Sequence, residues 1–194
     1  MRKIMKSAVF LLALFPFVHL LIRALTNDLG PDPAKELSIE TGEWALRFLL
    51  ITLSLTPLRQ LTGKTGFILH RRMLGLFALF YASIHLLVWM TFILDFRWIA
   101  IVEEILDRPY ITVGFTAYVI LVALGITSTN TMMRKMGKNW KRLHRLVYIA
   151  AILAIVHLLW ILRADIAEAV LYGSLVFLLL GYRYVRSLRS KKYF

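Results

Sequence analysis

The amino-acid sequence predicts an all-α membrane protein, a six-transmembrane-helix bundle that forms a single domain over residues 1–194. Of the 194 residues, 59% are hydrophobic and 18% are charged, against roughly 45–50% and 25% in soluble proteins. The apolar residues are gathered in six long blocks, and a membrane helix needs about 20 such residues. Most lysines and arginines between the blocks lie on one side of the predicted bundle, and this bias sets the orientation of a membrane protein.

The first two predicted spans cover residues 8–25 and 44–58. The first follows a basic start and carries Pro16 and His19. We interpret it as a retained helix, since residues 24–26 (Ala-Leu-Thr) are a poor signal-peptide cleavage site. The second span is short and carries Arg47.

The other four predicted spans are longer or more uniformly apolar. They cover residues 73–94, 110–127, 146–162 and 166–184. An outer turn is predicted at residues 30–33, a proline-containing cap at 107–109 and a tight turn at 163–165. No internal repeat is evident in the sequence.

The distribution of charge predicts the direction of insertion. The first residues, the loops 59–72 and 134–145 and the tail from Arg183 carry 18 of the 24 lysines and arginines and no acidic residue. All 11 acidic residues lie in the other three loops or at the adjoining span ends. Because lysine and arginine favour the cytoplasmic side, both termini are expected in the cytoplasm.

Composition also excludes several functions. The absence of cysteine excludes a disulfide scaffold, a thiolate iron–sulfur or zinc site and a c-type haem attachment. The net charge of +13 does not indicate nucleic acid, because this composition does not suit a soluble basic domain. Anionic inner-leaflet lipids are the expected partners of the basic surface.

Two histidines within the predicted spans are the main candidate site residues. Ionisable side chains are costly in a membrane and mark functional sites by default. His85 lies about 18 Å above the inner end of its span, and His157 about 20 Å above the inner end of its own. Two imidazoles at one depth could ligate a haem iron from both faces. The structural alternative is that each histidine bonds to a polar group on a neighbouring helix.

The other three histidines have weaker functional interpretations. His144 lies among basic residues at the inner start of the fifth span, where an interfacial role is common. A second haem held by His144 and His70 is an alternative to a single haem. His19, alone on the first span, is interpreted as structural or interfacial.

From about Phe15 to Arg189, the chain resembles the MsrQ (YedZ) family of haem-binding membrane subunits, within the ferric reductase-like transmembrane group. The matching motifs lie, in chain order, at residues 30–35, 55–58, 71–76, 81–85, 108–110, 127–129, 134–140, 143–144, 147–148 and 157. The resemblance implies that His85, His144 and His157 are haem-associated metal ligands and that the chain has no catalytic residue. The wider group has two histidines on each of two helices, whereas the position 13 residues before His85 is Arg72.

The resemblance further implies a non-catalytic electron-transfer subunit with haem b and FMN. Electrons would enter from the quinone pool or a cytoplasmic flavin reductase. They would leave to a periplasmic molybdopterin subunit that reduces oxidised methionines in proteins. Two other functions stay open: a small transporter or channel with a histidine proton relay, and a cytochrome b anchor of another oxidoreductase.

Overall fold

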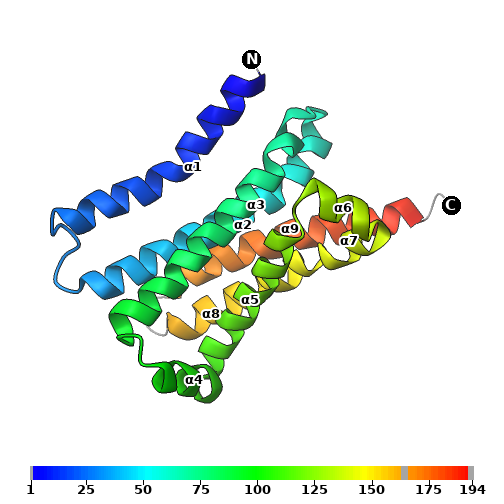
Figure 1. The fold of residues 1–194 in the computed structure, drawn as a ribbon. Helices are drawn as coiled ribbons and strands as arrows, with labels where there is room; N and C mark the ends of the chain where they lie inside the picture. The colour runs from blue at the N-terminus through cyan, green and yellow to red at the C-terminus, as the bar shows by residue number, and fades with distance from the viewer. Residues whose placement is uncertain (1, 163–165, 192–194) are drawn as a thin grey trace.

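The computed structural model describes residues 2–162 and 166–191, and every regular element in those ranges is helical. Figure 1 shows long helices that run side by side, with short helices at the ends of the bundle. The long helices are α1 (Arg2–Leu25), α2 (Pro33–Thr62), α3 (Gly66–Val88), α5 (Pro109–Ile126), α8 (Leu146–Ile161) and α9 (Ala167–Lys191). The short ones are the π-helical η1 (Trp89–Ile93), α4 (Trp98–Asp107), α6 (Asn130–Met136) and α7 (Lys138–Leu143).

Five helical stretches in the described part of the chain are long and apolar enough to cross a membrane. They are Ile4–Leu25, Gly66–Ile93, Pro109–Ile126, Lys138–Ile161 and Ala167–Leu188. These stretches coincide with five of the six predicted spans. The sixth predicted span, 44–58, lies inside the 30-residue helix α2, which is not among the five. A crossing by α2 therefore stays a prediction.

Helix α2 forms much of the core. Its nine buried residues outnumber those of any other described helix and include Leu53, which is fully buried. It packs most extensively against α3. A helix surrounded by other helices can carry polar side chains if its neighbours supply partners for them. This explains why α2 combines a buried position with a mixed sequence.

The bundle is organised around two extensively packed helix pairs, α2 with α3 and α5 with α8. Helices α3 and α5 connect the pairs, while α9 packs on α8 and α2, and α1 packs on α3 and α2. In Figure 1, the start of α1 and the end of α9 lie at the same end of the bundle as α6, α7 and the α2–α3 turn. The α1–α2 loop and α4 lie at the opposite end. The basic segments are thus gathered at one end, as the charge distribution predicted.

The Tyr81 hydroxyl of α3 forms two hydrogen bonds with the backbone of α1, next to Pro16. Its hydroxyl accepts from the Phe17 amide and donates to the Ala13 carbonyl, at 2.9 Å in each case. Those two groups would bond to each other in a regular α-helix. An inserted side chain of this kind bends a helix, and Figure 1 shows the bend in α1. Because Tyr81 is fully buried, its hydroxyl satisfies two groups that water cannot reach.

The cap predicted at residues 107–109 is confirmed, but Asp32, predicted as part of a turn, is also a helix cap, and three short helices were missed. Asp32 caps α2 by accepting from the Lys35 amide at 3.1 Å, and Pro109 begins α5. Segments interpreted as loops contain α4, α6 and α7. Helices as short as these carry too little apolar periodicity to be distinguished from loops. The turn predicted at 163–165 lies outside the described residues.

Candidate functional site

The structure brings together the two histidines that were predicted to lie at one depth. His85 projects from α3 and His157 from α8. Their ring centroids are 6.3 Å apart, and the ring planes are inclined by 82°. Both residues are only partly buried, so protein atoms do not cover the whole of either side chain. The two histidines lie 72 positions apart in sequence and connect α3 to α8.

Each of the two rings is bonded to a backbone carbonyl of another helix. Nδ1 of His85 lies 2.8 Å from the Ser38 oxygen, and Nδ1 of His157 lies 2.6 Å from the Tyr110 oxygen. A carbonyl oxygen only accepts, so each Nδ1 must carry the proton. In the neutral ring, Nε2 then keeps its lone pair. Within the described residues, neither Nε2 makes a hydrogen bond.

This arrangement fits a metal held between two imidazoles. An imidazole nitrogen lies about 2 Å from its metal, so two rings on opposite sides of one metal have centroids roughly 6 Å apart. The observed 6.3 Å agrees with that spacing. Metal-binding histidines also usually donate their other ring N–H to a carbonyl or carboxylate, which fixes the tautomer and the ring orientation.

The donor set favours a metal whose remaining ligands come from a cofactor. No group of three or more histidine, cysteine or acidic side chains suited to a bare ion occurs among the described residues. Two imidazoles alone are the protein's contribution to an iron that is already ligated by a haem macrocycle. The site residues therefore fit a haem better than a free metal ion.

Two glycines lie against the histidine rings. A Cβ atom built at Gly42 of α2 would lie 3.1 Å from Cε1 and Nδ1 of His85. One built at Gly114 of α5 would lie 2.6 Å from Nδ1 of His157. The sequence reasoning missed both glycines and both carbonyl partners. The sequence does contain a pattern that could have indicated the glycines: each lies 43 residues before its histidine, Gly42 before His85 and Gly114 before His157.

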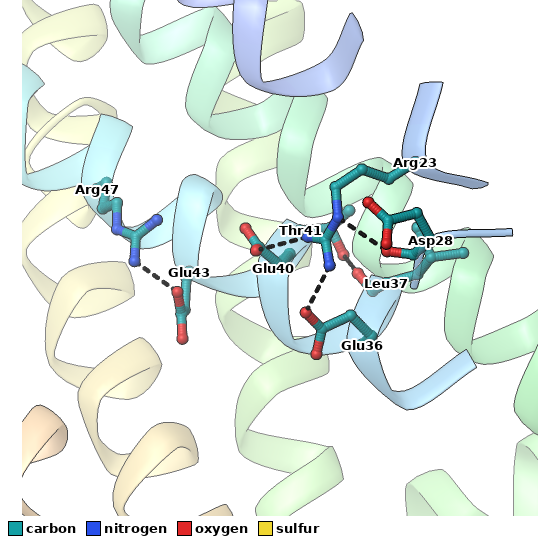
Figure 2. Close-up of polar contacts among 8 residues, drawn as sticks. All are labelled: Arg23, Asp28, Glu36, Leu37, Glu40, Thr41, Glu43 and Arg47. Atoms are coloured by element: carbon teal, nitrogen blue, oxygen red, sulfur yellow. Dashed lines mark hydrogen bonds and ion pairs between the residues drawn. The ribbon is translucent and has the colours of Figure 1, made fainter. Parts of the chain in front are cut away.

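The α2 segment that contacts His85 is held to α1 by charged side chains (Figure 2). The Arg23 guanidinium of α1 lies 3.4 Å from a carboxylate oxygen of both Glu36 and Glu40. Its Nε also donates to the Asp28 carbonyl at 3.2 Å. These contacts fix the start of α2 on both sides of Ser38, whose carbonyl accepts from His85.

Arg47, the charged residue of the second predicted span, also has partners. Its guanidinium lies 2.5 Å from the Glu43 carboxylate, one turn earlier on α2 (Figure 2). Its Nε donates to the Tyr172 hydroxyl of α9 at 2.9 Å. The guanidinium carbon also lies 4.8 Å from the centroid of the Trp44 ring. Arg47 thus links α2 to α9 close to Gly42.

His144 lies in a different environment, just after α7. Its Nε2 is 3.1 Å from Oγ1 of Thr127, and its ring stacks on Trp140 with 3.9 Å between centroids. The Thr127 hydroxyl donates to the Ala123 carbonyl at 2.7 Å, so it accepts from His144. In this arrangement Nε2 of His144 carries a proton. Its role as a haem-associated ligand stays a prediction.

His70 and His19 have surroundings that differ from those of the paired histidines. Both ring nitrogens of His70 are buried without a hydrogen-bond partner among the described residues. His19 is exposed on α1 and stacks on Phe15, with 6.1 Å between ring centroids. Arg72, at the position where the wider group has a histidine, donates to the Asn130 side chain at 2.7 Å.

Comparison with known proteins agrees with the resemblance noted in the sequence. Residues 41–155, more than half of the chain, match the family described as ferric reductase like transmembrane component. The chain is 52% identical over 167 residues to the protein-methionine-sulfoxide reductase heme-binding subunit MsrQ of Xanthomonas euvesicatoria pv. vesicatoria. That alignment covers 86% of this chain and 77% of the relative. The subunit of the same name from Bordetella pertussis is 42% identical over 180 residues, which are 92% of this chain and 87% of that protein.

Proposed function

We propose that this chain, which belongs to the MsrQ family of haem-binding subunits, is a b-type cytochrome that carries electrons outward across the bacterial inner membrane. The donor is the quinone pool or a cytoplasmic flavin reductase. The acceptor is a periplasmic molybdopterin methionine sulfoxide reductase that repairs oxidised proteins. FMN, which the resemblance implies, is part of this proposal without an assigned site.

The observation that carries the proposal is the pair of neighbouring imidazoles of His85 and His157, whose ring centroids are 6.3 Å apart. Each Nδ1–H donates to a carbonyl, so that each Nε2 is available to bind iron. A haem held by both rings would supply one-electron chemistry. The proposed haem is of b type, as the resemblance implies, and a chain without cysteine cannot attach a c-type haem through thioethers.

The proposed topology has six membrane crossings, with α2 as the second and both termini in the cytoplasm. The basic segments gathered at one end of the bundle support this orientation. His85 and His157 then lie in the outer half of the membrane, near the acidic end that would face a periplasmic partner. His144 lies toward the basic inner end, where we keep it as a second haem-associated residue.

The test is a spectrum and a haem-to-chain ratio for the purified protein in detergent. We expect the spectrum of a low-spin, bis-imidazole haem. In His85→Ala and in His157→Ala, we expect haem per chain to fall about tenfold or more, because an axial ligand is lost. His19→Ala, which changes an exposed histidine on α1, is the matched control and should keep the wild-type ratio. An unchanged spectrum in both His85→Ala and His157→Ala would refute the assignment.

The same preparation separates the remaining alternatives. A transporter or channel with a histidine relay predicts colourless protein and pH-dependent flux in vesicles. A cytochrome that anchors another oxidoreductase predicts normal haem without electron transfer to the periplasmic methionine sulfoxide reductase. Reduced protein that is reoxidised by that reductase together with its sulfoxide substrate supports the function proposed here.

A further inference from the structure

The surroundings of His85 and His157 are duplicated within the chain, although the sequence shows no evident repeat. His85 contacts Ser38 and Gly42 of α2, and His157 contacts Tyr110 and Gly114 of α5. Every residue of the second set lies 72 positions after its counterpart in the first. In both sets the carbonyl residue lies 47 positions before the histidine. The glycine follows the carbonyl residue by four positions, so carbonyl and glycine lie on one face of the helix.

Backbone conformation does not explain the two glycines. Gly30, Gly63 and Gly137 adopt positive φ angles, which favour glycine, but Gly42 and Gly114 do not. Both lie inside helices, where glycine is less favourable than alanine. What glycine provides at these two positions is space, because the histidine ring of the neighbouring helix lies within 3.1 Å of the position that a Cβ atom would take.

We propose that Gly42 and Gly114 are positioning residues for the two haem ligands. Each allows an imidazole to lie directly on the backbone of the facing helix, within hydrogen-bond distance of the carbonyl one turn earlier. The carbonyl sets the tautomer, and the absent side chain sets how closely the ring approaches and how it is rotated. This inference rests on the proposed function, since it assigns a role to residues behind His85 and His157.

The two positions differ in how closely they fit the ring. A Cβ at position 114 would lie 2.6, 2.7 and 3.0 Å from Nδ1, Cε1 and Cγ of His157. A Cβ at position 42 would lie 3.1 Å from two atoms of His85 and 3.7 Å from Cγ. Gly114→Ala therefore forces the ring to move, whereas Gly42→Ala requires a shift of a few tenths of an ångström.

The test compares Gly114→Ala and Gly42→Ala with alanine substitutions at two other helix glycines. Gly125→Ala is the control on α5, because its Cβ meets the flexible end of Leu79, and Gly75→Ala is the control on α3, with its Cβ 3.5 Å from Thr52. The readouts are haem per chain, the spectral signature of the two axial ligands and the midpoint potential. We expect about a tenfold loss of haem affinity in Gly114→Ala, the magnitude typical of residues behind a ligand. Gly42→Ala should retain more haem with a shifted spectrum, and both controls should match the wild type.

Wild-type haem and spectrum in Gly114→Ala would overturn the inference. So would an equal loss in Gly125→Ala, because general disruption of α5 would then explain both. If the wild type carries no haem, or if His157→Ala keeps its full haem and spectrum, the proposed function fails instead.

A thermal-unfolding cycle in detergent tests the contact without relying on haem content. Gly114→Ala should lower the midpoint in the chain that has His157, but should not lower it in the His157→Ala background, where no ring remains to be displaced and alanine is the better helix former. Equal effects in both backgrounds would overturn the inference. This second measurement applies even if the haem is lost from several variants.

Discussion

The histidines that the proposed topology places in the outer and inner halves of the membrane differ in what their ring nitrogens face. In the outer pair, His85 and His157 give Nδ1–H to backbone carbonyls, and neither Nε2 makes a hydrogen bond in the described structure. At the inner end, His144 gives Nε2–H to Thr127 and stacks on Trp140. His70 has both ring nitrogens buried without a partner among the described residues. A histidine is thus prepared as a metal ligand by the bond that its other nitrogen makes.

A second difference lies in how the two regions are held. Around the outer pair, carbonyls, glycines and linked charges fix the α2 and α5 segments that contact the rings. At the inner end, the bonds join short helices that follow α5, and several of the groups are partly exposed. We expect substitutions around the outer pair to change both haem content and stability. Those at the inner end should have little effect on the outer haem.

The largest expected difference separates His157→Ala from His144→Ala. His157→Ala should lose about tenfold or more of the haem that absorbs as a bis-imidazole complex. His144→Ala should keep that signal, because its ring belongs to the inner end of the bundle. Quantitative haem and protein assays with spectra of the reduced protein measure both. If His144→Ala abolishes the same signal, the outer pair is not the ligand set.

Breaking the Arg47 contacts should have the next largest effect. Arg47→Met removes the ion pair with Glu43 and the hydrogen bond to Tyr172, and because both charged side chains are only partly buried we expect a loss of about 2–3 kcal/mol, below the range for a fully buried pair. Denaturation in mixed detergent micelles measures the loss. In the double variant Glu43→Gln/Arg47→Met, part of the stability should return. A double variant less stable than Arg47→Met would contradict this account.

Tyr81→Phe should have a moderate effect on stability. The substitution keeps the ring, which stacks on Phe48 with 5.2 Å between centroids, and removes only the hydroxyl. The Phe17 amide and the Ala13 carbonyl then lose a buried partner, at a cost of about 2 kcal/mol. Unfolding midpoints in detergent check this value. Tyr118→Phe, at a hydroxyl with a longer 3.3 Å contact to Ser83, is the control and should change the midpoint less.

Trp140→Phe should have the smallest effect. It removes the indole N–H that donates to the Thr127 carbonyl at 2.9 Å and keeps an aromatic ring beside His144. One partly exposed hydrogen bond contributes about 1 kcal/mol. The outer haem spectrum should not change. A spectral change as large as that of Gly114→Ala would show that the two regions are coupled.

The main histidines of the candidate site were predictable from sequence, because they were chosen by their depth in the predicted membrane spans. The heights of His85 and His157 follow from counting residues along apolar spans, since an α-helix rises by a constant amount per residue. In the structure the two ring centroids lie 6.3 Å apart, while ligation by these rings stays a prediction. Their partners were not predictable in this way, because a backbone carbonyl has no residue identity and every residue carries one.

The sequence by itself determined the helical membrane class, the positions of five apolar helices long enough to span a membrane, the separation of charges and the similar depth of His85 and His157. Apolar composition and span length are properties of single segments, so no knowledge of neighbouring helices is needed. Only the tertiary structure decided which helices pair and which nitrogen of each ring is protonated. It alone explains why Gly42 and Gly114 carry no side chain, because the reason is an imidazole on another helix, 43 positions away.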